Sequence, residues 1–156
     1  MSQSKSLDAI DSALVTVMRL SKRPAYWEEF QSIVGQSIDR PSMAILLMLS
    51  DQPLRFQEVV QRLGVEAPSI SRKVHELELA GLIMRTPTDD RRVHLLSLTA
   101  KGNNLAKDIA SARRQMLKLI LNDWDDDEQI RFSELITLLA DGMSNRYGNK
   151  INRKEQ

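Results

Sequence analysis

The chain has 156 residues, of which 42% are hydrophobic and 28% are charged, and it contains no cysteine. These values exclude a disordered chain, a membrane-embedded chain, a disulfide scaffold and any cysteine-based zinc or redox site. The net charge of +1 and the two histidines favour neither a nucleic-acid binder nor a histidine metal cage. The first residues lack the apolar stretch of a secretory signal, and no apolar run is long enough for a membrane span. We therefore expect a cytoplasmic protein without a membrane partner, and we expect no cofactor or metal.

The N-terminal part of the chain predicts three helices. Apolar residues recur at three- and four-residue intervals over residues 6–18, as they do in an amphipathic helix. Pro24 interrupts this pattern and suits the first turn of a second helix. Asp39 and Pro41 predict the start of a third helix, because an Asp side chain caps free N–H groups and Pro fixes φ. This helix should be buried, since the run 43–49 is apolar on most faces.

The central part predicts a helix-turn-helix followed by a β-hairpin. A short helix over 56–63 ends at a glycine, and a second helix follows with Gly81 as its left-handed end. The inward positions of this second helix are Ala67, Ile70, Val74 and Leu77. Two short helices with a tight glycine-containing link are typical of a helix-turn-helix. The stretches 82–85 and 93–98 then predict two strands around a turn at 86–90, which together form a wing.

Two further helices are predicted after the wing. Thr99 caps a long helix over 100–122, and an acidic cluster at 123–128 opens a last one. The residues of the long helix expected inside are Leu105, Ile109, Ala112, Met116, Leu119 and Ile120. Divalent-cation binding by the acidic cluster is the weaker explanation, because acidic residues crowd helix starts for dipole reasons alone.

The terminal helices carry apolar stripes that have no partner in a wing domain. Dimerisation through these helices is the economical explanation, with an interface on the order of 2,000 Å² or more. The expected interface residues are Leu7, Ile10, Leu14, Leu135, Leu139 and Met143. The predicted division is a helical dimerisation region at 1–38 and 100–147, a DNA-binding domain at 39–99, and a flexible tail at 148–156.

The outer face of the second helix of the motif is the candidate DNA-reading surface. With the apolar stripe facing the core, Arg72 lies opposite it, and its guanidinium matches O6 and N7 of guanine. Small residues in the first turn would let the backbone approach a phosphate or a base edge. The candidate contacts on this helix are Pro68, Ser69, Ser71, Arg72, Lys73 and His75. On this helix alone, an ordinary solvated face explains the pattern equally well.

The predicted turn of the wing carries Asp90, Arg91 and Arg92 as further DNA contacts. A narrow minor groove attracts an inserted guanidinium, and an adjacent carboxylate can hold that guanidinium in position. A salt-bridged surface turn would explain an isolated Asp-Arg-Arg triplet better. Because this triplet follows a helix-turn-helix, DNA binding is the favoured explanation here.

The stretch SISRKVHELELAGLIMRTPTDDRRVHLLSLTAKG, residues 69–102, resembles the signature of the MarR family. The elements that match are Ser71-Arg72, Leu77-Glu78, Gly81-Leu82-Ile83, Arg85, Asp90-Arg91-Arg92, Leu98-Thr99 and Gly102. Their spacing matches as well, and the resemblance covers about residues 6–147.

This resemblance implies a mostly α winged helix-turn-helix protein with a small β-wing. It implies a homodimer on a pseudo-palindrome of double-stranded DNA, with recognition helices in successive major grooves and Arg92, supported by Asp90, in the minor groove. Many members repress transcription and release DNA on binding a small phenolic or other aromatic effector. The chain departs from the family in the weak helix caps at Arg55 and Glu66 and in Pro24, which should split a helix. The absence of cysteine also excludes peroxide sensing.

Tyr26, Trp27 and Phe30, with Trp124, are the candidates for an effector pocket, although a place in the core or the dimer interface explains them better. An enzyme would need a nucleophile with a base, a metal cluster or a phosphate loop, and the sequence has none. An RNA binder would show stacking aromatic residues on the exposed face of the motif, and that face has none. A winged helix that binds only protein partners is the alternative, and Arg72, Arg91 and Arg92 favour DNA over it.

Overall fold

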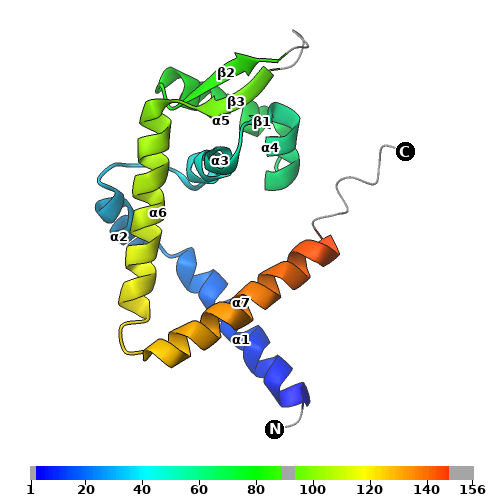
Figure 1. The fold of residues 1–156 in the computed structure, drawn as a ribbon, viewed down its shortest axis with the longest axis vertical. Coiled ribbons are helices and arrows are strands. Elements are labelled where there is room, and N and C mark those ends of the chain that lie inside the picture. Colours follow the sequence, from blue (N-terminus) through cyan, green and yellow to red (C-terminus); the bar gives the residue numbers. More distant parts are fainter. Residues whose placement is uncertain (1–2, 89–93, 148–156) are drawn as a thin grey trace.

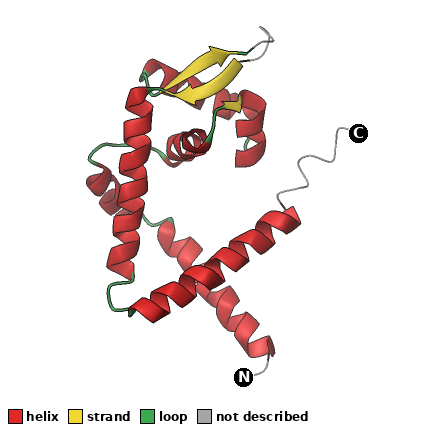
Figure 2. Ribbon diagram, in the orientation of Figure 1, coloured by secondary structure: helices red, strands yellow, loops and turns green. Residues whose placement is uncertain are grey.

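The computed structural model describes residues 3–88 and 94–147. These residues form a mostly helical chain with one small sheet, which confirms the predicted fold class (Figures 1 and 2). The elements are α1 (Gln3–Ser21), α2 (Pro24–Val34), α3 (Arg40–Asp51), β1 (Leu54–Arg55), α4 (Phe56–Leu63), α5 (Ala67–Leu79), β2 (Ile83–Pro87), β3 (His94–Leu98), α6 (Ala100–Ile120) and α7 (Asp126–Tyr147). None of the helices in these ranges is long and apolar enough to span a membrane.

Helix boundaries follow the capping residues that the sequence predicted. Pro24 lies in the first turn of α2 and separates it from α1, as expected. The Asp39 carboxylate accepts a hydrogen bond from the Ser42 N–H at 2.8 Å and caps α3. Thr99 caps α6 in the same way, because its hydroxyl oxygen accepts from the Gly102 N–H at 3.0 Å.

One hydrophobic core holds α2 to α6 and the sheet together. Its centre is α3, in which Ile45 and Leu46 have no exposed surface. Helix α6 packs against both α2 and α3 along its inner face. Helices α2 and α6 belong to the proposed dimerisation region, and both contribute residues to the core of the winged helix. The two proposed regions therefore share one core. The domain division at 38/39 and 99/100 remains a prediction.

Three predicted core positions are exposed, and the predictions were wrong there. Leu119 and Ile120 are 57% and 62% exposed. The last buried residue of α6 is Met116, and the helix continues beyond the core toward α7 (Figure 1). Ala67 is exposed because it begins α5, one turn before the first residue of that helix that reaches the core.

The sheet contains a strand that the sequence analysis missed. Its order is β1-β3-β2 with both pairings antiparallel, and Leu54 lies opposite Leu96. Strand β1 has two residues, too few to show an alternating pattern. Strand β2 also extends through Pro87, which pairs with His94, so residues 86 and 87 belong to a strand and not to the predicted turn.

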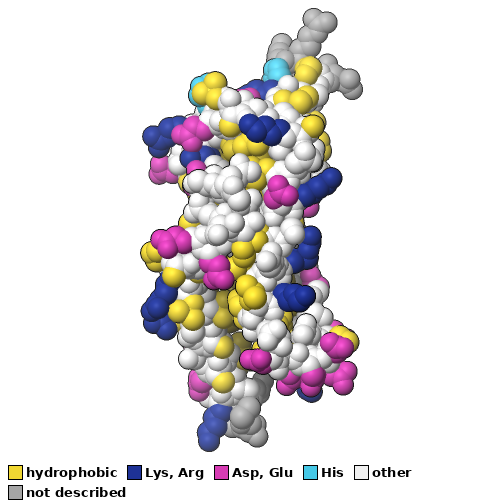
Figure 3. Space-filling model, turned by 90° about the vertical axis from the view of Figure 1, so that its left-hand side faces the viewer, with side chains coloured by type: hydrophobic (Ala, Val, Ile, Leu, Met, Phe, Trp, Pro, Cys, Tyr) yellow, Lys and Arg dark blue, Asp and Glu magenta, His cyan; other side chains and the backbone are white. Residues whose placement is uncertain are grey.

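The terminal helices project away from this core (Figure 1). All residues of α7 are exposed, including seven large apolar side chains and a tyrosine. Among the described elements, α7 makes at most marginal contacts, and α1 packs appreciably only on α2. In Figure 3, apolar side chains are visible at the surface over the whole height of the molecule, including its lower half. The subunit thus exposes an apolar surface larger than isolated surface residues produce.

Candidate nucleic-acid interface

Helices α4 and α5 form the helix-turn-helix. Gly64 ends α4 with a φ of +63°, a left-handed conformation that glycine adopts without strain, and α5 begins three residues later. Neither helix start has a side-chain cap, although the Arg55 N–H donates to Glu58 at 2.7 Å. Helix α5 is held instead by its apolar stripe against α3 and α4. The buried residues of this stripe are Ile70, Val74 and Leu77.

Five of the six candidate contacts on α5 lie on its solvent side. Arg72 is exposed and lies opposite the buried stripe. The other four are Pro68, Ser69, Ser71 and His75. Leu79, in the last turn of α5, is 75% exposed on the same side as Arg72. A charged fork and short polar side chains thus occupy a projecting helix face, an arrangement suited to major-groove contact.

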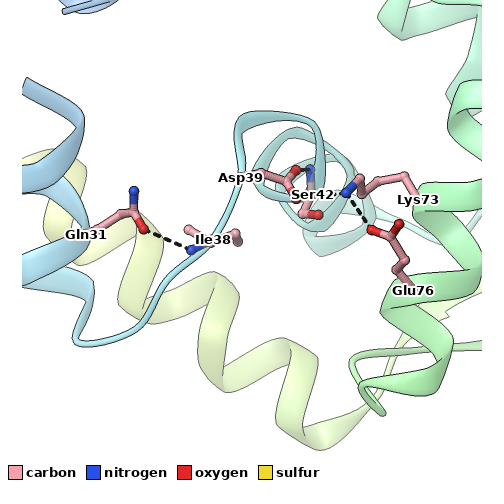
Figure 4. A network of polar contacts seen from close by, with 6 residues as sticks. All are labelled: Gln31, Ile38, Asp39, Ser42, Lys73 and Glu76. Atoms are coloured by element: carbon pink, nitrogen blue, oxygen red, sulfur yellow. Dashed lines mark hydrogen bonds and ion pairs between the residues drawn. The ribbon is translucent and has the colours of Figure 1, made fainter. Parts of the chain in front are cut away.

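Lys73, the sixth candidate, is engaged within the protein. Its ammonium group donates to Asp39 Oδ2 at 2.9 Å and to Glu76 Oε2 at 2.5 Å (Figure 4). Burial alone would raise the pKa of Asp39, but hydrogen bonds from Lys73 and Ser42 outweigh it and hold that pKa below its usual value. The hydrogen bonds to Glu76 and Asp39 raise the pKa of Lys73.

Polar contacts join the end of α5 to the wing and to α6. Arg85 Nε in β2 donates to Glu78 Oε1 in α5 at 2.7 Å. The Thr99 hydroxyl donates to the Gly81 carbonyl at 2.7 Å, and the Lys101 ammonium donates to the Ala80 carbonyl at 2.8 Å. Four of these residues belong to the motif that resembles the family signature. Their contacts give them a structural role that the sequence analysis did not assign.

Gly102 permits the closest approach in this joint. A Cβ atom at this position would lie 1.9 Å from the Leu82 carbonyl oxygen, far inside van der Waals contact. That oxygen also accepts the Thr99 N–H at 3.0 Å. The start of α6 therefore packs directly on the backbone that enters β2. The glycine in the motif is needed for this packing.

The wing-tip candidates Asp90, Arg91 and Arg92 lie outside the described residues. Strands β2 and β3 are paired as far as Pro87 and His94, on either side of this segment in the sequence. The proposed minor-groove contact remains a prediction from the sequence.

Three of the four effector-pocket candidates pack in or against the core, whereas Trp124 is 39% exposed and packs edge-on against Phe132 of α7. Phe30 is 2% exposed, and Trp27 stacks on it with the ring centroids 5.0 Å apart. The Arg40 guanidinium lies 4.5 Å from the centre of the Trp27 ring. Tyr26 is half-buried beside this core. A nearby cavity of about 270 Å³ between α2 and α6 is lined by Ile33, Val34, Asp108, Ser111, Ala112 and Gln115.

The acidic cluster before α7 has a local role. Asp125 and Glu128 form a capping box: the Glu128 N–H donates to Asp125 Oδ1 at 2.8 Å, and the Asp125 N–H donates to Glu128 Oε2 at 3.0 Å. Within the described ranges, no three His, Cys, Asp or Glu residues are grouped so that they could hold a metal ion. Helix capping accounts for these two carboxylates.

Comparison with known proteins agrees with this geometry. A model of the MarR family matches residues 36–92, from the connection before α3 into the wing. The HTH-type transcriptional regulator YxaD of Bacillus subtilis (strain 168) is 27% identical over 138 residues, which cover 87% of this chain and 94% of YxaD. The HTH-type transcriptional repressor MdtR of the same strain is 25% identical over 138 residues, covering 87% of this chain and 89% of MdtR.

Solved structures share the fold along most of the chain. A MarR family protein from Bacillus stearothermophilus superposes with a TM-score of 0.78 at 19% identity, covering 92% of this chain and 99% of that one. The PcaV regulator of Streptomyces coelicolor, solved with its natural ligand, gives a TM-score of 0.58 at 26% identity over 81% of this chain and 89% of PcaV. The relatives are regulators and not enzymes. The chain is thus similar, in sequence and in fold, to the MarR family of winged helix-turn-helix transcriptional regulators.

Proposed function

We propose that this regulator binds a pseudo-palindromic site on double-stranded DNA as a homodimer, with α5 in the major groove. The observation that carries the proposal is the outer face of α5, where Arg72 and short polar side chains are exposed opposite a buried apolar stripe. An arginine on such a face can pair with guanine through two hydrogen bonds. Arg92 is assigned to the minor groove by the resemblance in sequence. Such a protein acts in the cytoplasm, where bacterial DNA lies.

The dimer part of the proposal is supported by the exposed apolar side chains of α1 and α7. The six predicted interface residues are between 36% and 60% exposed in the single subunit: Leu7, Ile10, Leu14, Leu135, Leu139 and Met143. Burial of both helices in a second copy would remove this surface from water. A homodimer has two-fold symmetry, and a pseudo-palindrome presents two half-sites with the same symmetry.

We also propose that the protein is a repressor that a small aromatic molecule releases from DNA. Two relatives support this: MdtR is a repressor, and PcaV was solved with a natural ligand. The cavity between α2 and α6 is a place where such a molecule would contact the core that carries α5. Binding there would change DNA affinity only if the ligand prefers one orientation of the two α5 helices.

Selection from a library of random duplexes tests the proposal. We expect the wild-type protein to enrich an inverted repeat whose half-sites are separated by about one helical turn, 10–10.5 base pairs. An Arg72→Ala protein should lose the enrichment at one position in each half-site, whereas a control substitution of the exposed Lys107 on α6 should keep it. No enriched sequence with the wild-type protein would contradict the proposal.

That negative outcome would favour the second candidate, a winged helix that binds a protein partner. The specific observation in its favour is Leu79, whose 75% exposed side chain lies on the candidate DNA face. An apolar residue in this position suits a protein interface better than a phosphate backbone. A Leu79→Lys substitution separates the two functions. It should leave DNA binding intact or strengthen it, and it should weaken docking of a protein partner.

A further inference from the structure

Unlike the other candidate DNA contacts on α5, Lys73 forms ion pairs with carboxylates of its own subunit. Its side chain is 22% exposed, and its ammonium group contacts two carboxylates. One of these, Glu76, lies on α5 itself, three residues further along. The other, Asp39, lies at the start of α3, 34 residues away in the sequence. The second contact therefore joins two helices, and the first does not.

Asp39 uses its two oxygens for two different helices. Oδ1 accepts the Ser42 N–H at 2.8 Å and caps α3, while Oδ2 accepts from Lys73 at 2.9 Å. The preceding residue, Ile38, donates its N–H to Gln31 Oε1 of α2 at 3.3 Å (Figure 4). A continuous set of polar contacts thus runs from α2 through the start of α3 to the middle of α5. The cap holds the Asp39 carboxylate in a defined position toward Lys73.

This contact adds a directional restraint to the apolar packing of α5. The attraction between apolar surfaces has little directional preference of its own. A hydrogen-bonded ion pair on the shoulder of α5 is directional. Because successive residues of a helix are about 100° apart, fixing the direction of Lys73 also fixes that of Arg72.

We propose that Lys73 is a positioning residue and not a phosphate contact, and that its ion pair with Asp39 sets the orientation in which α5 presents Arg72 to DNA. The inference rests on the proposed DNA-binding function. It assigns a role in sequence discrimination to Asp39, a residue on a different helix. It also separates Lys73 from the other predicted contacts of α5, which lie on the exposed face of that helix.

The test compares affinities for two duplexes at several salt concentrations. One is the duplex that the wild-type protein selects from a random library, and the other has the same bases in scrambled order. We expect Lys73→Met to lower the ratio of the two affinities by up to about fivefold, the most that loss of one partly exposed ion pair allows. The slope of log affinity against log salt should stay unchanged, since no phosphate contact is lost. A phosphate contact would make that slope shallower by about 0.9 per site.

Three further variants make the test specific. Asp39→Asn keeps a side chain that caps α3 but removes the negative charge, so it should lower the ratio as Lys73→Met does. Glu76→Gln removes the contact within α5 and leaves the ion pair with Asp39, so the ratio should stay near the wild-type value. Combining Asp39→Asn with Lys73→Met should add little to either single change, because both remove the same pair.

Two results would overturn the inference: an affinity ratio that stays unchanged, whether or not both affinities fall, or a shallower salt slope with Lys73→Met. If Lys73→Met does not fold, Asp39→Asn and Lys73→Arg decide, since arginine should restore the ratio. A failure of the DNA-binding function itself would appear earlier, as a wild-type protein that selects no duplex.

Discussion

Replacement of Gly102 by alanine should destabilise the protein, although alanine is the better helix former. At an exposed position within a helix, replacing glycine by alanine would raise the free energy of unfolding by about 1 kcal/mol. Here the new Cβ would lie 1.9 Å from the Leu82 carbonyl oxygen and 2.9 Å from its carbonyl carbon. That backbone has little freedom to move, because the Leu82 N–H donates to Leu77 and the Leu82 carbonyl accepts from Thr99, each at 3.0 Å.

The expected net loss is about 2 kcal/mol. Overpacking a well-filled site costs about 1–3 kcal/mol, and a clash with two backbone atoms belongs at or above the upper end of this range, against a helix-propensity gain of about 1 kcal/mol. For a chain of this size, the melting temperature should fall by about 4–8 °C at fixed protein concentration. Thermal unfolding followed by circular dichroism measures this change.

An exposed position of the same helix provides the control. Asn104 lies in α6 two residues after Gly102, and its side chain is exposed. Because alanine is also the better helix former there, Asn104→Ala should keep the melting temperature or raise it. A Gly102→Ala protein as stable as the wild type would refute the close packing of α6 on the wing. Because Gly102 lies where α6 meets the wing, the variant should also bind the selected duplex more weakly.

Three further predictions concern DNA binding and acid stability. Arg72→Ala should cost about 1–3 kcal/mol on the selected duplex and less on its scrambled form, with an unchanged melting temperature, as measured by fluorescence anisotropy. An equal loss of affinity on both duplexes would show that Arg72 contacts phosphate and not a base. Arg92→Ala should weaken binding more than tenfold and leave the fold intact, with Arg91→Ala as the control; equal effects would indicate a diffuse basic patch. Asp39→Asn should lower the free energy of unfolding at pH 7 by up to about 1 kcal/mol, and urea titrations should show this difference shrinking as the pH falls below about 3.8, because a carboxylate with a lowered pKa loses its stabilising effect on protonation. A difference that keeps its full size down to pH 3 would mean that the ion pair does not cause it.

Periodicity and capping residues predicted most of the fold. Asp39, Thr99 and Pro24 mark helix starts in the sequence and in the structure, because a cap is a local interaction between residues three apart or less. Strand β1 escaped prediction because two residues carry no period. Leu119 and Ile120 continue an apolar stripe beyond the point where the subunit has a core, and periodicity alone does not show where the packing partner ends.

The candidate site was predicted less completely than the fold. A helical wheel places Arg72 correctly on the outer side of α5, because that direction depends only on local geometry. Lys73 lies on the shoulder of the same wheel, and its partner Asp39 is 34 residues away, so only the tertiary structure reveals the pair. The need for glycine at position 102 also arises from the tertiary structure, because the Leu82 carbonyl lies against it. No pattern within α6 indicates this contact.

The stoichiometry of the complex with the selected duplex tests the central proposal most directly. Native mass spectrometry resolves one from two copies of a 17.8 kDa chain on a single duplex. We predict two chains on the full inverted repeat, no stable single-chain complex, and a large loss of affinity when one half-site is scrambled. A single chain bound with full affinity to one half-site would contradict the account of a dimer that reads both halves of its site.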